Sequence, residues 1–410
     1  MNVRMEGWAE HSARFLRSLL TPAGSPSVAN GAVTLYGTCY SLLAMHYLGE
    51  DVDVASDIRD FVLSAQDATT GLFAGPELVG FEPPPAAKHD RDHVLLHLTC
   101  TVLPFCQQFS IKPRHPIHSA HRFCDLSVLE RWMGERDLRQ AWLEGNNILF
   151  VGQLLAYLRD VERHPGAADA LKLWFAWLDA HADPKTGLWG TDGFCSAPEA
   201  VYGGYHQLLV YYHENHPLPN AGGLVDTVLA FQHNDGSFHP DGNGGACADV
   251  DSVDILVNCY KRADYRRAEI RHSLRRCLRH ILSTQNADGG FPYYRNRPQS
   301  HMGIPSTEAG PNVSCTFPTW FRIHTLALIA EVLPNETALA GIPFRFNRAF
   351  GMGWHSSPPG WEPVGDGATL EERMVDLRHG VRQIARGPHG VLHASRRLGG
   401  KVLRKARLKR

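Results

Sequence analysis

A short phrase that returns four times along the chain constrains the fold more than any other feature. The copies are residues 66–73 (QDATTGLF), 183–189 (DPKTGLW), 232–238 (QHNDGSF) and 285–291 (QNADGGF). Each copy follows an apolar stretch of helical periodicity, and another such stretch comes after it. Repeats at this spacing are typical of stacked helical units, each of which buries its apolar face against its neighbours. The sequence therefore predicts one large repeat domain.

Apolar residues recur at helical spacing in segments of two alternating kinds. We expect the amphipathic segments to be outer helices with a charged face toward water; they cover residues 8–20, 54–66, 124–136, 166–181, 221–232 and 266–285. We expect the nearly continuous apolar segments to be inner helices; they cover residues 35–48, 92–106, 143–158, 200–213, 248–260 and 318–333.

Six such pairs close a circle, so the sequence predicts an all-α (α/α)6 toroid of six outer and six inner helices over residues 1–334. Proline-rich stretches at 76–90 and 292–317 predict long loops over its rims. From residue 335 to 410 glycine and proline rise and the periodicity fades. This segment predicts an irregular C-terminal wrap that ends in a basic, partly disordered tail.

The composition excludes several classes of protein. No run of 18 or more apolar residues occurs, which argues against a transmembrane helix, and the first residues lack the apolar core of a signal peptide. The nine cysteines form no CxxC pair and indicate the reduced thiols of a cytoplasmic protein. The net charge is only −1, yet residues 396–410 hold eight Lys or Arg and no acid. This tail predicts either a solvated chain end or a peripheral membrane contact; no nucleic-acid motif accompanies it, so no nucleic-acid partner is expected.

The starts of the predicted inner helices carry many polar side chains. In a toroid these ends meet at one mouth, and burying polar groups costs free energy unless they pair with one another or with a ligand. We therefore expect a functional site at this mouth. The polar and aromatic residues there are Tyr36 and Thr38; Asp90, Asp92, His93 and His97; Glu144, Asn146 and Asn147; Tyr202, Tyr205 and His206; Cys247, Asp249 and Asp251; and Trp320, Arg322 and His324.

The sharpest local motif is the acidic segment 247–254 (CADVDSVD) at the start of the fifth inner helix. Asp249 and Asp251 are two positions apart, and close carboxylates repel each other, so that one can keep its proton near neutral pH. A protonated carboxyl group in a dry cavity is a general acid, whereas an ionised pair suits a metal ion. Ordinary capping of the helix is the alternative without function.

The intact phrase QxxxGx(F/W) at residues 232–238 and 285–291 resembles the QW repeat of squalene–hopene cyclases and other class II terpene cyclases. In those enzymes a DxDD motif follows one repeat at the start of an inner helix, and Asp249, Asp251 and Ser252 stand at that place here. The resemblance implies an isoprenoid cyclase in which Asp251 is the general acid and Asp249 its supporting partner. It requires no cofactor, although Mg²⁺ would accompany a diphosphate substrate.

Under this hypothesis the remaining mouth residues serve the same reaction. Tyr202, Tyr205 and Trp320 would stabilise developing positive charge by cation–π attraction, and His206 joins Tyr205 in the predicted catalytic set. The expected substrate-binding residues are Tyr36, Asp92, His93, Asn146, Asn147, Tyr202, Trp320 and Arg322.

A zinc enzyme is a second interpretation. The β subunits of protein prenyltransferases belong to the same superfamily and bind zinc through an Asp-x-Cys pair and a later histidine. The segment Ile323-His324-Thr325 resembles the part that holds this histidine. Asp251 matches the aspartate of the pair, but Val253 stands where its cysteine would be, and Cys247, one helical turn before Asp251, is the thiol that would replace it. The zinc site expected under this interpretation is made by Cys247, Asp251 and His324, together with His206.

Carbohydrate chemistry is a third interpretation. The turn at 183–189 and the segment 202–206 (YGGYH) resemble parts of (α/α)6 unsaturated glucuronyl hydrolases and polysaccharide lyases. Lyases of this shape use Asn to neutralise a uronate and Tyr or His to move a proton, and the chain offers these types at Asn146, Asn147, Tyr205 and His206. A sugar epimerase would fit as well. A scaffold without enzymatic activity would instead pair its mouth residues internally and leave no cavity.

Overall fold

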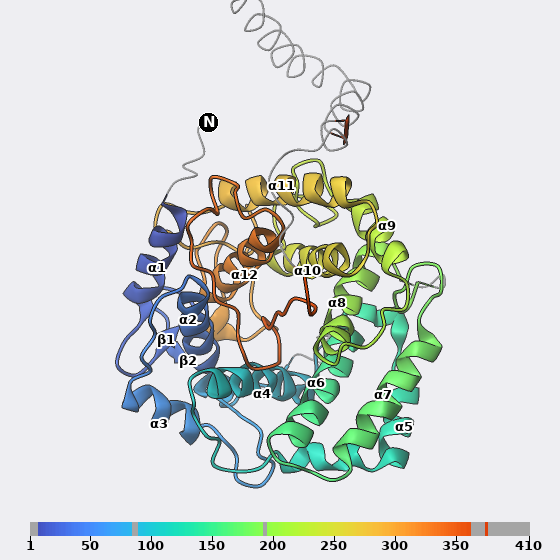
Figure 1. The fold of residues 1–410 in the computed structure, drawn as a ribbon. Coiled ribbons are helices and arrows are strands. Elements are labelled where there is room, and N and C mark those ends of the chain that lie inside the picture. The colour runs from blue at the N-terminus through green and yellow to red at the C-terminus, as the bar shows by residue number, and fades with distance from the viewer. Residues whose placement is uncertain (1–6, 84–88, 192–194, 362–373, 376–410) are drawn as a thin grey trace, which may run out of the picture.

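The computed structural model describes residues 7–83, 89–191, 195–361 and 374–375, and within them the chain is all-α apart from one short hairpin (Figure 1). Every segment predicted as helical contains an α-helix, so the all-α prediction is confirmed. The α-helices are α1 (Trp8–Leu19), α2 (Leu35–Tyr47), α3 (Ser56–Ser64), α4 (Arg91–Gln108), α5 (Leu126–Gly134), α6 (Ala141–Asp160), α7 (Ala167–His181), α8 (Ala197–His213), α9 (Ala221–Phe231), α10 (Ala246–Arg262), α11 (Arg267–Ser283) and α12 (Thr316–Val332).

The minor elements lie in the connections. Strands β1 (Ser25–Pro26) and β2 (Val33–Thr34) pair antiparallel just before α2. The 3-10 helices are η1 (Pro76–Leu78), η2 (His118–Cys124), η3 (Leu138–Gln140) and η4 (Pro305–Thr307). The first and last of these fall in the two long loops that the sequence predicts.

The even-numbered helices contact one another in a closed cycle. Helix α2 packs on α4, α4 on α6, α6 on α8, α8 on α10 and α10 on α12, and α12 returns to α2. In Figure 1 these helices lie around the centre of the molecule and the odd-numbered helices lie at its periphery; we call the even-numbered set the inner helices. The difference follows from the sequence, because the inner helices are apolar on nearly every side. In α12, for example, every residue from Thr316 to Ile329 is buried.

The repeated phrase forms the turn between an outer helix and the next inner helix. Its glycine has a left-handed backbone, with φ of 76° at Gly71, 71° at Gly187, 101° at Gly236 and 93° at Gly289. A β-carbon on Gly289 would lie 2.2 Å from the carbonyl oxygen of His11 in α1. Glycine is therefore required both by the backbone conformation and by the close approach of the neighbouring helix.

The glutamine that opens the phrase ties the turn to the next outer helix. The Nε2 of Gln232 donates to its own turn and to the carbonyl oxygen of Ser273 in α11, at 3.0 Å. In the last copy the Nε2 of Gln285 donates in the same way to the carbonyl oxygen of Trp8, at 2.9 Å. Because Trp8 begins α1, this last copy joins the end of the repeat series to its start.

The aromatic residue that closes the phrase is fixed by a side chain near the start of the next inner helix. In three copies its backbone N–H donates to an oxygen on that helix. The three bonds join Phe73 to Thr99 (2.9 Å), Phe238 to Asp249 (2.7 Å) and Phe291 to Thr319 (2.9 Å). We call Thr99, Asp249 and Thr319 the turn anchors. Asp249 thus holds a position that threonine holds in the other two copies.

The described part of the predicted C-terminal wrap crosses the C-terminal ends of the inner helices. The hydroxyl of Tyr47 donates to the carbonyl oxygen of Gly353. The buried ammonium of Lys261 in α10 lies 2.7 Å from Glu331 of α12 and 2.8 Å from the Nε2 of His355. These contacts hold the segment 344–361 against the C-terminal ends of the inner helices. The basic tail at 396–410 lies outside the described residues. Within the described part, each helix is too short or too polar to cross a bilayer.

Because some turn glycines lie against a neighbouring helix and other glycines do not, a Gly→Ala substitution should lower the stability by different amounts at the two kinds of position. Gly289→Ala adds a β-carbon where the backbone is left-handed and His11 leaves no space, whereas Gly80 has a φ of 66° and no neighbouring atom within 4 Å. A left-handed backbone alone costs about 1–2 kcal/mol, and overpacking adds about 1–3 kcal/mol. Urea unfolding should therefore show that Gly289→Ala loses clearly more stability than Gly80→Ala. Equal losses would mean that the contact with α1 relaxes without cost.

Candidate functional site

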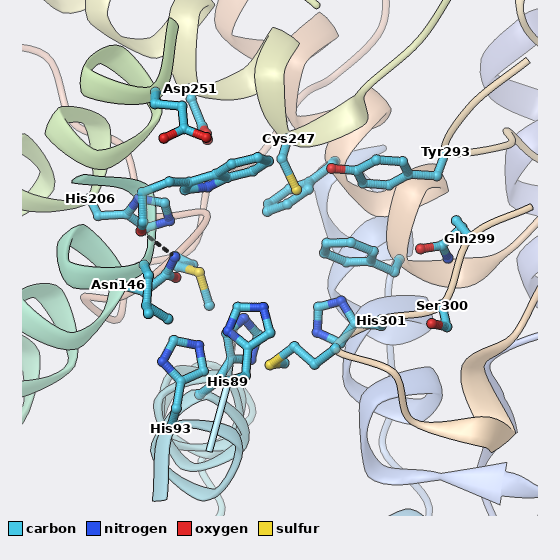
Figure 2. A pocket seen from close by; sticks show the side chains of 18 of the residues that line it. His89, His93, Asn146, His206, Cys247, Asp251, Tyr293, Gln299, Ser300 and His301 are labelled. Atoms are coloured by element: carbon cyan, nitrogen blue, oxygen red, sulfur yellow. Dashed lines mark hydrogen bonds between the residues drawn. The ribbon is translucent and has the colours of Figure 1, made fainter. Parts of the chain in front are cut away.

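A cavity of about 360 Å³ lies at the N-terminal ends of the inner helices (Figure 2). Asp251 and Cys247 line it from α10, and His89 and His93 face them from the opposite side at the start of α4. The long loop before α12 contributes a further wall. The polar lining residues are His89, His93, His97, Arg139, Gln140, Asn146, Glu199, His206, Asp251, Gln299, Ser300 and His301, and the aromatic ones are Trp142, Tyr293, Tyr294, Phe317 and Phe321.

The turn anchors determine which residues of the inner helices face this cavity. Residues two positions apart on an α-helix lie about 200° apart around its axis. An anchor that points toward its turn therefore directs the residues two positions before and after it toward the other side of the helix. The lining residues at these positions are His97, Cys247 and Phe317 before the anchors, and Asp251 and Phe321 after them.

Asp251 is a buried carboxyl group in the cavity wall. Its side chain is 1 % exposed, and its Oδ2 has no hydrogen-bond partner among the described residues. Burial raises its pKa well above the usual range, and the nearby carboxyl groups of Asp254 and Asp249 raise the pKa further. Both effects favour the protonated form of Asp251, and its position in the wall places this carboxyl group beside the space of the cavity.

Asp249 has a different environment, although it is only two residues away. Besides accepting from Phe238, it forms an ion pair with Arg322 of α12, and both side chains are completely buried. The Nε and Nη2 of Arg322 have no hydrogen-bond partner within the described part of the chain. Neither residue lines the cavity. This pair joins α10 to α12 behind the wall, so Asp249 influences Asp251 through its charge and not through a hydrogen bond.

His206 lines the cavity, and one hydrogen bond fixes its neutral tautomer. Its Nδ1 lies 2.6 Å from the carbonyl oxygen of Tyr202, and because a carbonyl oxygen only accepts, this nitrogen donates and Nε2 carries the lone pair. Burial lowers the pKa of His206 to about 4. The imidazole is therefore neutral at physiological pH and acts as a weak base.

The ring of His93 is oriented by a chain of polar groups on α6. The Nδ2 of Asn147 donates to Glu144 at 3.1 Å, so that the Oδ1 of Asn147 faces the Nδ1 of His93 at 2.8 Å. Since an amide oxygen only accepts, Nδ1 of His93 donates and its Nε2 is again the free acceptor. Burial lowers the pKa of this histidine as well.

Two further histidines face each other across the cavity wall. The rings of His97 and His301 lie 5.0 Å apart, and the hydroxyl of Tyr36 lies 2.9 Å from the Nδ1 of His97. Burial lowers the pKa of His301 to about 3, and burial together with the neighbouring imidazoles lowers the pKa of His97 well below its usual value. Together with His93 and His206, these imidazoles are uncharged at neutral pH.

The structure brings some of the predicted site residues into the wall and places the others behind it. Tyr202 donates to the carbonyl oxygen of Phe238 at 2.6 Å and so supports a turn, while Trp320 stacks between Tyr40 and Phe321. Those that line the cavity are His93, Asn146, His206, Cys247 and Asp251. Those outside the lining are Tyr36, Asp92, Asn147, Tyr202, Tyr205, Asp249, Trp320, Arg322 and His324, of which Asp92 is exposed at the start of α4.

The residues considered for zinc do not all line the cavity: Cys247, Asp251 and His206 do, and His324 does not. Cys247 lies in the cavity wall, where burial raises the pKa of its thiol. His324 lies two turns into α12 and stacks on Tyr47 with ring centres 5.3 Å apart, away from the lining. Among the described residues, no group of three or more His, Cys, Asp or Glu side chains is arranged to hold a metal ion.

Sequence reasoning missed the walls that come from irregular segments. The loop before α12 supplies Tyr293, Gln299 and His301, and the C-terminal segment supplies Met352. Neither segment has a hydrophobic period, so no pattern indicates which of its side chains point inward. The only signal is position, because Tyr293 follows the last copy of the repeated phrase by two residues.

The comparisons with known proteins assign no relative to this chain. No protein-family model matches it, and no curated protein does. The cavity wall itself combines the carboxyl groups of Asp251 and Glu199 with several neutral imidazoles and an aromatic face.

The buried ion pair behind the wall yields a prediction about stability. Asp249→Asn leaves the charge of Arg322 buried and unpaired, and breaking a buried pair in this way costs about 3–5 kcal/mol. Urea unfolding followed by circular dichroism should show a loss of this size. The double variant Asp249→Thr, Arg322→Leu restores a threonine anchor like Thr319 and removes the charge, so it should recover most of the loss. A single variant as stable as the wild type would contradict the pairing.

Proposed function

We propose that this chain is an (α/α)6 toroid whose cavity carries out proton-initiated cyclisation of an isoprenoid. The closed cycle of contacts from α2 to α12 and the peripheral position of the odd-numbered helices support the toroid. The observation that carries the reaction is Asp251, a buried carboxyl group in the cavity wall whose pKa is raised by burial and whose Oδ2 has no hydrogen-bond partner among the described residues.

The first step is proton transfer to a carbon–carbon double bond or an epoxide. Water would compete for the proton and for the cation, so the donor must be dry and must hold its proton until the substrate binds. Burial of Asp251 fulfils both conditions. The negative charge of Asp249 opposes ionisation of Asp251, and Arg322 keeps Asp249 itself in place.

The electrostatics of the wall suit the cation that follows. Positively charged imidazoles would repel a carbocation, but burial keeps His93, His97, His206 and His301 neutral. The faces of Trp142, Phe317 and Phe321 attract positive charge through their quadrupoles. The lone pair on the Nε2 of His206 can take up the final proton, which ends the reaction with a new double bond.

The rim of the cavity restricts the substrate. Arg139 is the one Lys or Arg among the described lining residues, and its guanidinium is held by Asp137 through bonds of 2.6 and 3.0 Å. The amides of Gln140, Asn146 and Gln299 and the carboxyl group of Glu199 complete the polar lining, so that no unbalanced positive charge is available for a diphosphate. We therefore propose an isoprenoid with an uncharged polar end, such as an alcohol or an epoxide; Mg²⁺ would be needed only for a diphosphate.

A carbohydrate substrate is the second candidate, because one side of the cavity is distinctly polar. Figure 2 shows His89, His93, Asn146, Gln299 and Ser300 around the lower part of the cavity. Amides, hydroxyls and imidazoles in this arrangement suit sugar hydroxyls, and protonated Asp251 would serve a hydrolase or a lyase as general acid.

Loss of the acid should abolish turnover. We expect Asp251→Asn to lower kcat by about 10²–10⁴-fold, because the amide keeps the shape of the side chain but has no acidic proton. The assay is incubation with squalene, its epoxide, farnesol and the C15 and C20 diphosphates, with products identified by gas chromatography and mass spectrometry. Asp92→Asn, the same change at an exposed position of α4, is the matched control. A cyclic product formed by Asp251→Asn at the wild-type rate excludes this residue as the acid, and turnover of uronate-containing oligosaccharides alone would favour the second candidate.

The pH profile of kcat/KM should reflect the raised pKa of Asp251 and the lowered pKa of His206. Asp251 donates only while protonated, so kcat/KM should stay level through neutral pH and fall on the alkaline side. His206 accepts only while neutral, so kcat/KM should also fall on the acid side, near its pKa of about 4. A profile that already declines as the pH rises from 4 to 5 would show that Asp251 titrates as an ordinary carboxyl group.

A further inference from the structure

The C-terminal segment forms a tight turn at the cavity wall, and we call its residues 351–354 the central turn. The carbonyl oxygen of Gly351 accepts from the backbone N–H of Trp354 at 2.9 Å. Gly353 has a φ of 85°, which is the conformation that the second central position of a type II turn requires. Met352 occupies the first central position, is 5 % exposed and lines the cavity. The turn thus places one methionine side chain against the space of the cavity.

The central turn is packed between inner helices. A β-carbon on Gly351 would lie 2.4 Å from the Cγ of Pro104 in α4. A β-carbon on Gly353 would lie 2.5 Å from the hydroxyl oxygen of Tyr47 in α2 and 2.7 Å from the Cζ2 of Trp320 in α12. Side chains cannot approach one another that closely, so both positions need glycine. The turn is therefore held in place by α2, α4 and α12.

The residues on either side of the central turn contact further inner helices. Before the turn, the ring of Phe350 stacks on His213 of α8 with ring centres 4.1 Å apart. After it, the Nε2 of His355 lies 2.8 Å from the ammonium of Lys261 in α10. Because these contacts and those of the turn reach helices on different sides of the cycle, the segment 350–355 crosses its interior.

A second hollow, of about 160 Å³, lies further along the same helices. On three inner helices, a residue that lines the second hollow follows a cavity-lining residue by six or seven positions, or about 9–11 Å along the helix. These pairs are His97 and Leu103 in α4, Asn146 and Gln153 in α6, and His206 and His213 in α8. From the C-terminal segment, Met352 lines the cavity, whereas Ala349 and Phe350 line the second hollow. The segment therefore separates two spaces that follow one another along the interior of the cycle.

We propose that Met352 is the stop that limits how long an isoprenoid chain the cavity can hold. This inference rests on the proposed function, because it describes the substrate of that reaction. The polar groups at the mouth hold the uncharged polar end of the substrate, and the apolar chain extends toward the central turn until it meets Met352. Met352 is thus a residue that determines specificity and takes no part in the proton transfers.

The size of the cavity indicates which chains fit in front of the stop. Ligand pockets in proteins commonly have volumes of about 300–1,000 Å³, and about 360 Å³ lies near the lower end of this range. The central turn cannot move back, because its two glycines lie against neighbouring helices. A C15 isoprenoid alcohol is therefore the expected class of substrate, whereas the C30 chain of squalene would need the space behind the turn.

The limiting chain length can be measured without any reaction. Saturated straight-chain alcohols of about 6 to 14 carbons have no double bond to protonate, and each further buried CH₂ group should tighten their binding about fourfold. Isothermal titration calorimetry on the wild type should show that this gain ends at one chain length, where the chain end reaches Met352. Met352→Ala removes the Cγ, Sδ and Cε atoms, so the gain should continue for about three further carbons.

Met302 provides the matched control. It also lines the cavity, but it comes from the long loop before α12 and is partly exposed. Met302→Ala removes the same atoms and should leave the limiting chain length unchanged. If urea unfolding shows that Met352→Ala has lost its fold, Met352→Leu takes its place, because a swap of similar volume is tolerated better, and it should move the limit by about one carbon. An affinity that rises through the whole series in the wild type, a limit that stays the same when Met352 is shortened, or equal shifts in both alanine variants would overturn the stop.

Turnover separates this inference from the proposed function. If the wild type cyclises a C15 isoprenoid, Met352→Ala should raise kcat/KM for the C20 chain relative to the C15 chain by about tenfold or more, the effect that a single methylene group can have on specificity. A shifted binding limit without a cyclic product from either chain would refute the proposed function and leave the stop in place. Cyclisation with an unshifted limit and an unchanged ratio would refute the stop alone.

Discussion

The hydrogen bond that fixes three of the four repeated turns to the following inner helix is the contact on which the site depends. Its acceptor is a neutral hydroxyl at Thr99 and Thr319, but a carboxylate at Asp249. A buried carboxylate needs a counter-charge, and Arg322 supplies it from the neighbouring helix. The same charge opposes ionisation of Asp251 two residues later. An aspartate at the anchor position, where the other two copies have threonine, thus changes the chemistry of the cavity wall.

The helices could be predicted from the sequence because burial imposes a period on it. The outer helices alternate between apolar and charged faces, and the inner helices, such as α12, are apolar almost throughout. The roles of the two aspartates could not be separated in this way. Asp249 and Asp251 are the same residue type at the same helix start, and they differ in their contacts, since Phe238 and Arg322 bind Asp249 alone. The positions of His301 and Met352 in the cavity wall could not be predicted either, because both residues come from segments without hydrophobic periodicity.

Residue type alone also gave a misleading view of charge. The sequence shows many histidines at the mouth, and histidine is the side chain most easily protonated near neutral pH. The structure buries them, and burial favours the uncharged ring, as the lowered pKa values of His206 and His301 show. The four histidines thus add no positive charge to the cavity wall, and the charged side chains that line it are Arg139, which Asp137 balances, and the acidic residues Glu199 and Asp251.

The contacts at the two ends of the chain have a consequence for biosynthesis. Gln285 bonds to Trp8, and Met352 forms part of the cavity wall. A nascent chain emerges from the ribosome with its N-terminus first. Helix α1, which is made first, can therefore form its contact with Gln285 only after most of the chain has been translated. The cavity wall is therefore incomplete until translation has passed the segment that contains Met352, and a prematurely terminated polypeptide can contain all the helices from α1 to α12 and still lack this part of the wall.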